Sequence, residues 1–231
     1  ADAGIQAKIA IKDVFAGVGM GFSVNGLSTL NLENSIVSDV MQGTGNLVAG
    51  NDIDDVTDGG WISEAYLTYG FGNTSIKAGR QTLPKALSPF AYSENWNVFE
   101  NTFDSVLVVN TDLPDTALVY AWVYGGNFNS YGAVATANNM TDFNSFNDED
   151  GVHMLTIQNK SITNLTLTGS YYYGQDMAVT DDVSILWGDA AYDAGNFGIA
   201  IQGGQVDAGL ADDMTAFGAK VDGSVSGINL M

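Results

Sequence analysis

Apolar and polar positions alternate along most of this chain. The alternation is clearest in residues 61–70, whose two faces are Ala65, Leu67 and Tyr69, and Glu64, Tyr66 and Thr68. A period of two predicts β-strands with one apolar and one polar face. No apolar run approaches the roughly twenty residues that a membrane-spanning helix needs, so the pattern excludes a helical membrane protein.

The same pattern predicts about twelve strands along the chain. They are 5–11, 15–24, 61–70, 74–81, 104–111, 116–124, 152–158, 165–173, 183–192, 197–204, 214–222 and the start of a last strand at 225–231. Their connections are alternately short and long, with the longest loops at 25–60, 82–103 and 125–151. An up-and-down barrel has this asymmetry because every second connection emerges at the same rim. A Greek-key sandwich offers no reason for it.

Aromatic residues near strand ends point the same way. They include Tyr69, Phe71, Tyr124, Tyr171, Tyr173, Trp187, Tyr192 and Phe197. Transmembrane barrels carry aromatic girdles at both interfaces, although a sandwich core would also use such residues. We therefore predict an all-β fold, a transmembrane antiparallel up-and-down β-barrel, formed by residues 1–231 as a single domain.

Acidic residues are in large excess in this chain, and they are unevenly distributed along it. The chain has 7 basic and 27 acidic residues and a net charge of −20, which argues against nucleic acid as a partner. Together with the shorter loops 174–182 and 205–213, which emerge at the same rim, the long loops contain 18 of the 27 acids, and Lys85 is the only basic residue in them. Without cysteine, the chain forms no disulfide and no thiolate metal site.

Two runs of sequence resemble a known family. EAYLTYGFGNTSIKAGRQTL, followed by ENTFDSVLVVNTDLPDTALV, is similar to the major outer membrane porins of Campylobacter-type bacteria. The resemblance implies a trimeric diffusion channel of about 18 strands, in the Gram-negative outer membrane, with residues 82–103 as an inward-folded constriction loop. The chain is then either part of such a barrel or a smaller, twelve-stranded one.

A porin works through the charges that line its narrowest point. The candidate pore and constriction residues are Glu64, Lys77, Arg80, Gln81, Lys85, Glu94, Glu100 and Asp104. Three of them are basic and close together in sequence, and the acids across the loop would create a transverse field. Arg80 lines the pore only if the strand ends or bulges at Gly79, because strict alternation places it on the apolar side. The alternative is a set of surface ion pairs with little effect.

No enzyme motif emerges from the sequence. The single histidine, His153, lies in an apolar strand without a recognisable catalytic partner. The acidic stretch containing Asp52, Asp54 and Asp58 has some likeness to a calcium loop, but its spacing differs from that of an EF-hand. The acidic stretch is therefore a candidate calcium site, the one cofactor that the sequence suggests, and a solvated acidic loop is the alternative.

The predicted function is a water-filled, weakly cation-selective outer-membrane channel for ions and small hydrophilic solutes. Its partners would be outer-membrane lipid, lipopolysaccharide and two further copies of the chain. The alternative hypothesis is a secreted, calcium-dependent, β-rich adhesin or surface-layer protein, which would be soluble and stabilised by calcium.

Overall fold

The computed structural model describes residues 3–30, 42–44, 58–128, 139–178, 181–209, 212–225 and 228–230. Most of these residues are extended, and the short 3-10 helices are η1 (Lys85–Leu87) and η2 (Asn147–Glu149). Within the described ranges, no helix combines the length and the apolar character needed to cross a membrane. The chain divides into two compact units. One consists of Ala1–Gly70, Ile76–Val106 and Val123–Glu149, and the other of Phe71–Ser75, Leu107–Trp122 and Asp150–Met231.

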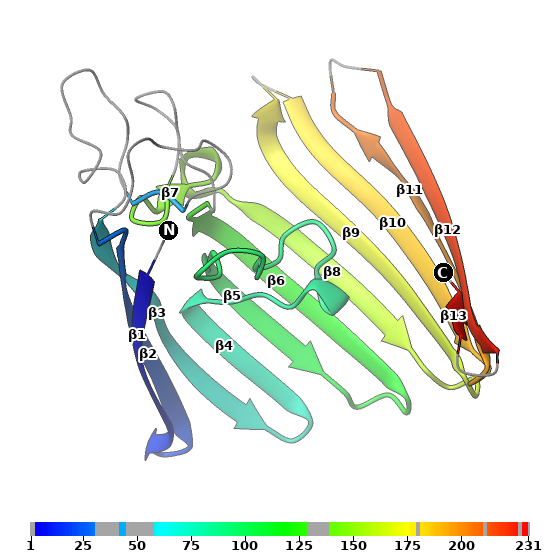
Figure 1. The fold of residues 1–231 in the computed structure, drawn as a ribbon, viewed down its shortest axis with the longest axis horizontal. Helices are drawn as coiled ribbons and strands as arrows, with labels where there is room; N and C mark the ends of the chain where they lie inside the picture. The colour runs from blue at the N-terminus through cyan, green and yellow to red at the C-terminus, as the bar shows by residue number, and fades with distance from the viewer. Residues whose placement is uncertain are drawn as a thin grey trace. The chain divides into compact units, whose positions relative to one another are not determined.

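The strands follow one another in the sheet in the order of the chain (Figure 1). They are β1 (Ala3–Phe15), β2 (Val18–Ser28), β3 (Gly59–Phe71), β4 (Thr74–Gln81), β5 (Phe103–Asn110), β6 (Thr116–Gly126), β7 (Asn144–Ser145), β8 (Val152–Asn159), β9 (Leu165–Ala178), β10 (Asp181–Asp193), β11 (Phe197–Asp207), β12 (Met214–Val225) and β13 (Ile228–Leu230). Only the two-residue β7 lies off this path, paired with the end of β6. The predicted all-β, up-and-down arrangement of about twelve strands is confirmed.

In the first unit, the register of β1, β2 and β3 separates a polar face from an apolar face. Lys8 lies opposite Ser23, which in turn lies opposite Glu64. On the other face Ile9 lies opposite Phe22, and Ile9 is exposed although it is apolar. A register shift between Ser23 and Val24 leaves room for an extra residue in β3. The strands therefore have one polar face and one exposed apolar face.

The second unit has the same division. Thr156 lies opposite Ser170, and their hydroxyl groups are 2.9 Å apart. On the reverse face Leu155 lies opposite Tyr171, and both are exposed. Leu167 is 40% exposed whereas the adjacent Thr168 is only 8% exposed, as expected for neighbours on opposite faces. The predicted alternation in residues 165–173 is confirmed.

The first hairpin turns later than the sequence predicts. The prediction placed a turn at 12–14, but β1 continues to Phe15 and the turn consists of Ala16 and Gly17. Both residues have positive φ, 51° and 81°, which is the geometry that matches the twist of paired strands. The backbone N–H of Gly17 also donates to Asp13 at 3.1 Å. The polar residues Lys12 and Asp13 therefore lie just before the turn, and the turn itself forms at Gly17, where a positive φ is readily adopted.

Candidate pore constriction

The segment between β4 and β5 lies against the polar face of β1–β3. A cavity of about 270 Å³ separates the two and is lined by both. Its lining from the strands is Gln6, Lys8, Asn25, Ser63 and Glu64, and its lining from the loop is Thr82, Val98, Phe99, Glu100 and Thr102. Residues 82–102, the inward loop, therefore cover the wall that would line a pore.

A small apolar cluster holds the inward loop in place. It contains Leu27, Trp61, Phe99 and Met140, with Phe143 packed against it. The rings of Trp61 and Phe99 meet edge to face, with centroids 5.4 Å apart and planes at 86°. Aromatic pairs favour this arrangement. Phe99 comes from the inward loop, and Met140 from the long loop after β6. Two loops and two strand ends thus share one core.

The amide of Gln42 adds a polar clamp at the same place. Its Nε2 donates to the carbonyl oxygen of Phe99 at 2.8 Å, and the N–H of Phe99 donates to its Oε1 at 3.0 Å. The side chain of Gln42 is fully buried. Next to it, the N–H of Met140 donates to the carbonyl oxygen of Gly43 at 3.0 Å. Parts of the other two long loops therefore hold the inward loop.

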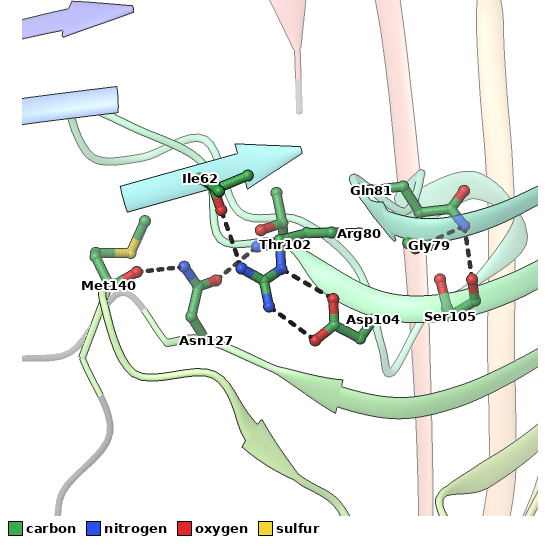
Figure 2. A network of polar contacts seen from close by, with 9 residues as sticks. All are labelled: Ile62, Gly79, Arg80, Gln81, Thr102, Asp104, Ser105, Asn127 and Met140. Atoms are coloured by element: carbon green, nitrogen blue, oxygen red, sulfur yellow. Dashed lines mark hydrogen bonds and ion pairs between the residues drawn. The ribbon is translucent and has the colours of Figure 1, made fainter. Parts of the chain in front are cut away.

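The base of the inward loop is fixed by an arginine–carboxylate pair (Figure 2). The guanidinium of Arg80 donates to both oxygens of Asp104, from Nε at 2.9 Å and from Nη2 at 3.0 Å. Its Nη1 donates to the carbonyl oxygen of Ile62 at 3.1 Å, and its central carbon lies 3.2 Å from the centroid of the Phe143 ring. This bidentate geometry is the strong form of the interaction. The predicted opposition of Arg80 and Asp104 across the constriction is in fact a direct pair.

Gly79 gives this base its geometry. Its φ of 117° departs from regular strand geometry, and a Cβ atom there would collide with the carbonyl oxygen of Ala65. Two residues later, the buried Gln81 donates from Nε2 to the carbonyl oxygen of Ser105 at 3.1 Å. Gln81 therefore acts as a brace between β4 and β5.

Asn127 links the far end of the inward loop to the loop after β6 (Figure 2). Its Oδ1 accepts from the N–H of Thr102 at 2.7 Å, and its Nδ2 donates to the carbonyl oxygen of Met140 at 2.8 Å. Sequence reasoning found neither Asn127 nor Gln42. Both are polar loop residues whose partners are distant in the chain, so no local pattern marks them.

The wall beneath the loop carries a charged cluster. Lys8 and Glu64 form an ion pair, in which the side chain of Glu64 is 5% exposed. Beside them, the Nζ of Lys77 lies 3.8 Å from the centroid of the Tyr66 ring, a cation–π contact. Glu64 and Lys77 were predicted here and Lys8 was not. The alternation of β1, which places Lys8 on the face of Gln6, could have identified it.

The remaining predicted residues lie on the loop itself. The Nζ of Lys85 is 4.5 Å from the centroid of the Tyr92 ring, and Glu94 accepts from Nε1 of Trp96 at 2.9 Å. Glu100 is exposed and belongs to the lining of the cavity against the wall. The structure therefore brings Glu64, Lys77 and Glu100 to one region, while Arg80 and Asp104 neutralise each other at its base.

The calcium prediction falls mostly outside the described residues. Asp52 and Asp54 lie there, so the structure does not bear on them. Asp58 accepts from the hydroxyl of Ser28 at 2.8 Å and from the N–H of Thr29 at 2.9 Å. Where the structure describes the chain, no three His, Cys, Asp or Glu residues are grouped so as to hold a metal ion. Calcium binding by the acidic stretch stays a prediction.

Comparison with known proteins identifies the fold. Neither the protein-family models nor the curated proteins searched give a match. Solved outer-membrane channels do match in structure. OccD3 (OpdP) of Pseudomonas aeruginosa aligns with a TM-score of 0.67 at 12% identity, over 96% of this chain and 48% of that one. The outer membrane protein OpdK of the same species aligns at 0.67 and 14% identity, over 97% and 57%.

A BenF-like porin from Pseudomonas fluorescens aligns with a TM-score of 0.61 at 13% identity, over 94% of this chain and 55% of that one. At such low identity the likeness shows the fold, which is that of outer-membrane porin barrels. The chain spans about half the length of these porins. The narrower resemblance to Campylobacter-type porins stays a prediction.

Proposed function

We propose that this chain is part of an outer-membrane porin, a water-filled channel for ions and small hydrophilic solutes. One observation carries the proposal: the inward loop is anchored on the polar face of a sheet whose other face exposes large apolar side chains. A soluble protein rarely exposes an extended apolar face. A barrel in a membrane needs that face outside and the polar face around its lumen.

The apolar face is the proposed lipid contact. Its exposed residues in the two units include Ile5, Ile9, Leu67, Leu155, Leu167, Leu186, Ile199 and Ile201. Each would cost free energy in water in proportion to its apolar area, at about 25 cal/mol per Å². Outer-membrane lipid, with lipopolysaccharide in the outer leaflet, would remove that cost.

Weak cation selectivity is the second part of the proposal. With a net charge of −20, the channel mouth accumulates cations and repels anions. At the constriction, Glu64 is neutralised by Lys8, and Asp104 by Arg80. The acids left to act on passing ions are therefore mainly Glu94 and Glu100, against Lys77 and Lys85.

We base the proposed architecture of the complete channel on the resemblance to porins. The complete barrel would have about 18 strands and would assemble as a homotrimer of the Campylobacter type. The strands of this chain would supply the part of the wall that carries the inward loop.

Planar-bilayer recordings test the proposed function. The detergent-extracted, full-length protein should insert as discrete conductance steps, and its reversal potential in a KCl gradient should indicate a modest preference for K⁺ that declines as salt rises. Anion preference would overturn the selectivity, and the absence of any conductance would overturn the porin proposal.

A further inference from the structure

A second cavity lies within the inward loop, away from the residues Gln42, Asn127 and Met140 that anchor the loop. Its volume is about 500 Å³. Its lining is Thr82, Leu83, Pro84, Lys85, Tyr92, Ser93, Glu94, Asn95, Trp96 and Glu100. Thr82 and Glu100 also line the cavity against the wall, so the two spaces adjoin. We call this second space the loop pocket.

Hydrogen bonds hold the loop pocket open. Its two sides are joined where the N–H of Ser93 donates to the carbonyl oxygen of Leu83 at 2.9 Å, and where the N–H of Leu83 donates to the hydroxyl of Ser93 at 3.1 Å. On one side the N–H of Glu94 donates to Oδ1 of Asn101 at 2.7 Å. The pocket is therefore preformed, and a ligand would bind without first ordering the backbone.

Its side chains combine carboxylates with aromatic rings. Trp96 is 55% exposed, and its indole N–H donates to the carboxylate of Glu94 at 2.9 Å. This bond fixes the exposed ring beside a negative charge. The exposed Glu100 supplies a second carboxylate in the same lining. The pocket thus offers one open aromatic surface and two acids.

The other aromatic ring in the lining, that of Tyr92, already has an ammonium group, that of Lys85, over its face. The Nζ of Lys85, the one basic residue in the lining, lies 4.5 Å from the centroid of the Tyr92 ring. Aromatic faces attract ammonium and guanidinium groups through their quadrupole. The lining therefore holds one ammonium group against two carboxylates, which leaves a net attraction for a second positive charge.

The geometry points to a binding site for an organic cation, an ammonium or guanidinium group attached to a flat apolar body. The cationic group would meet Glu94 and Glu100, and the apolar body would stack on Trp96. An inorganic cation would use the carboxylates but gain nothing from the indole. This inference rests on the proposed function, because the site would slow such a solute on its way through the channel.

Four small probes distinguish the classes of ligand. Benzylammonium has the charge and the ring, methylammonium has the charge alone, benzyl alcohol has the ring alone, and benzoate reverses the charge. Each is added to the full-length protein in a planar bilayer at constant KCl, and the dwell time and frequency of current interruptions give an apparent Kd. We expect concentration-dependent interruptions with benzylammonium, and weaker or none with the other three.

Substitutions locate the site. Trp96→Ala should weaken benzylammonium about two- to tenfold by removing the ring on which its apolar body stacks, while Trp96→Phe should retain part of the affinity. Glu94→Gln with Glu100→Gln should weaken it about tenfold or more, since charged hydrogen bonds are stronger. Lys85→Gln should strengthen it about two- to fivefold by freeing the Tyr92 ring, a gain that misfolding would not produce. Asp212→Asn, which removes a charge outside this loop, should leave it unchanged.

The outcomes separate this inference from the proposed function. Channels that conduct normally but show no benzylammonium interruptions would overturn the site and leave the porin intact. Equal interruption by benzyl alcohol would indicate a stacking site for neutral solutes, and interruption by benzoate an anion site, and either result would overturn the cation proposal. Unchanged affinity in Trp96→Ala would overturn the location. A protein that forms no channel would overturn the proposed function itself.

Discussion

Single residues with distant partners decide the shape of the constriction. Arg80 binds Asp104 across 24 positions, and Gln42 binds Phe99 across 57. The sequence predicts the first two as functional because they are charged and close to the predicted constriction loop. It cannot predict that they pair, since the pairing depends on the backbone geometry at Gly79, whose φ is 117°. Gln42 carries no local signal at all.

Removing one partner of the Arg80–Asp104 pair should destabilise the protein. Arg80 and Asp104 side chains are 23% and 20% exposed, so the remaining charge would be poorly solvated. We expect Arg80→Gln or Asp104→Asn to lower the free energy of unfolding by about 1.5–3 kcal/mol each. Urea titration in detergent micelles measures this. The double variant should lose clearly less than the sum of the two, and full additivity would show that the pair does not couple.

Gln42 should steady the inward loop. In Gln42→Ala the N–H and carbonyl groups of Phe99 lose their buried partners, which costs about 1–3 kcal/mol at the anchor. We expect noisier open-channel current and more frequent closures in bilayer recordings, with the same mean insertion efficiency. Gln205, which donates to Asp213 at 2.7 Å in an exposed position, provides the matched control as Gln205→Ala. Equal noise in both variants would contradict a clamp at Gln42.

At the scale of elements, alternation was sufficient to find the strands and their faces. Residues 61–70 and 165–173 show the predicted division because a period of two leaves no other choice of face. Their ends were harder to predict. The first turn moved to Ala16 and Gly17 because positive φ, rather than polarity, determines where a tight hairpin turns. Contacts between loops were invisible, since they follow no period.

The strand faces predict opposite environments for adjacent residues. Spin labels at Leu165 and Leu167 should be reached by lipid-soluble oxygen, and labels at Thr166 and Thr168 by aqueous quenchers. Leu67→Arg or Leu167→Arg should cost about 2–4 kcal/mol if the site is near the bilayer middle, and less near an interface. Equal aqueous access on both faces would contradict the membrane barrel.

At the scale of the whole molecule, charge is distributed unevenly along the chain. The net charge of −20 is concentrated in the long loops, and two of the ion pairs at the candidate constriction cancel locally. Composition predicted the sign of the field. It could not predict which acids remain unneutralised, because that depends on the partners that folding supplies.

Cation preference should therefore depend on two sets of acids in different ways. Glu94→Gln with Glu100→Gln should reduce the preference at all salt concentrations, because these charges lie on the inward loop. Replacing Asp52, Asp54 and Asp55 with Asn should reduce it only at low salt, when the Debye length exceeds about 10 Å. Reversal potentials at two ionic strengths measure both. Identical salt dependence in the two variants would contradict the distinction.

The hydrogen bonds between Gln42 and Phe99 also bear on the order in which parts of the protein fold. Thr141, in the loop after β6, donates to the carbonyl oxygen of Thr44, 97 positions away, beside the clamp. Contacts between such remote segments form slowly because a long stretch of chain must first be brought together. The strands β1–β3 can pair before the loop after β6 has folded. The anchor of the inward loop can be complete only after that loop has folded, because Met140 and Thr141 belong to it. We expect the wall of the channel to form first and its narrowest part to form last.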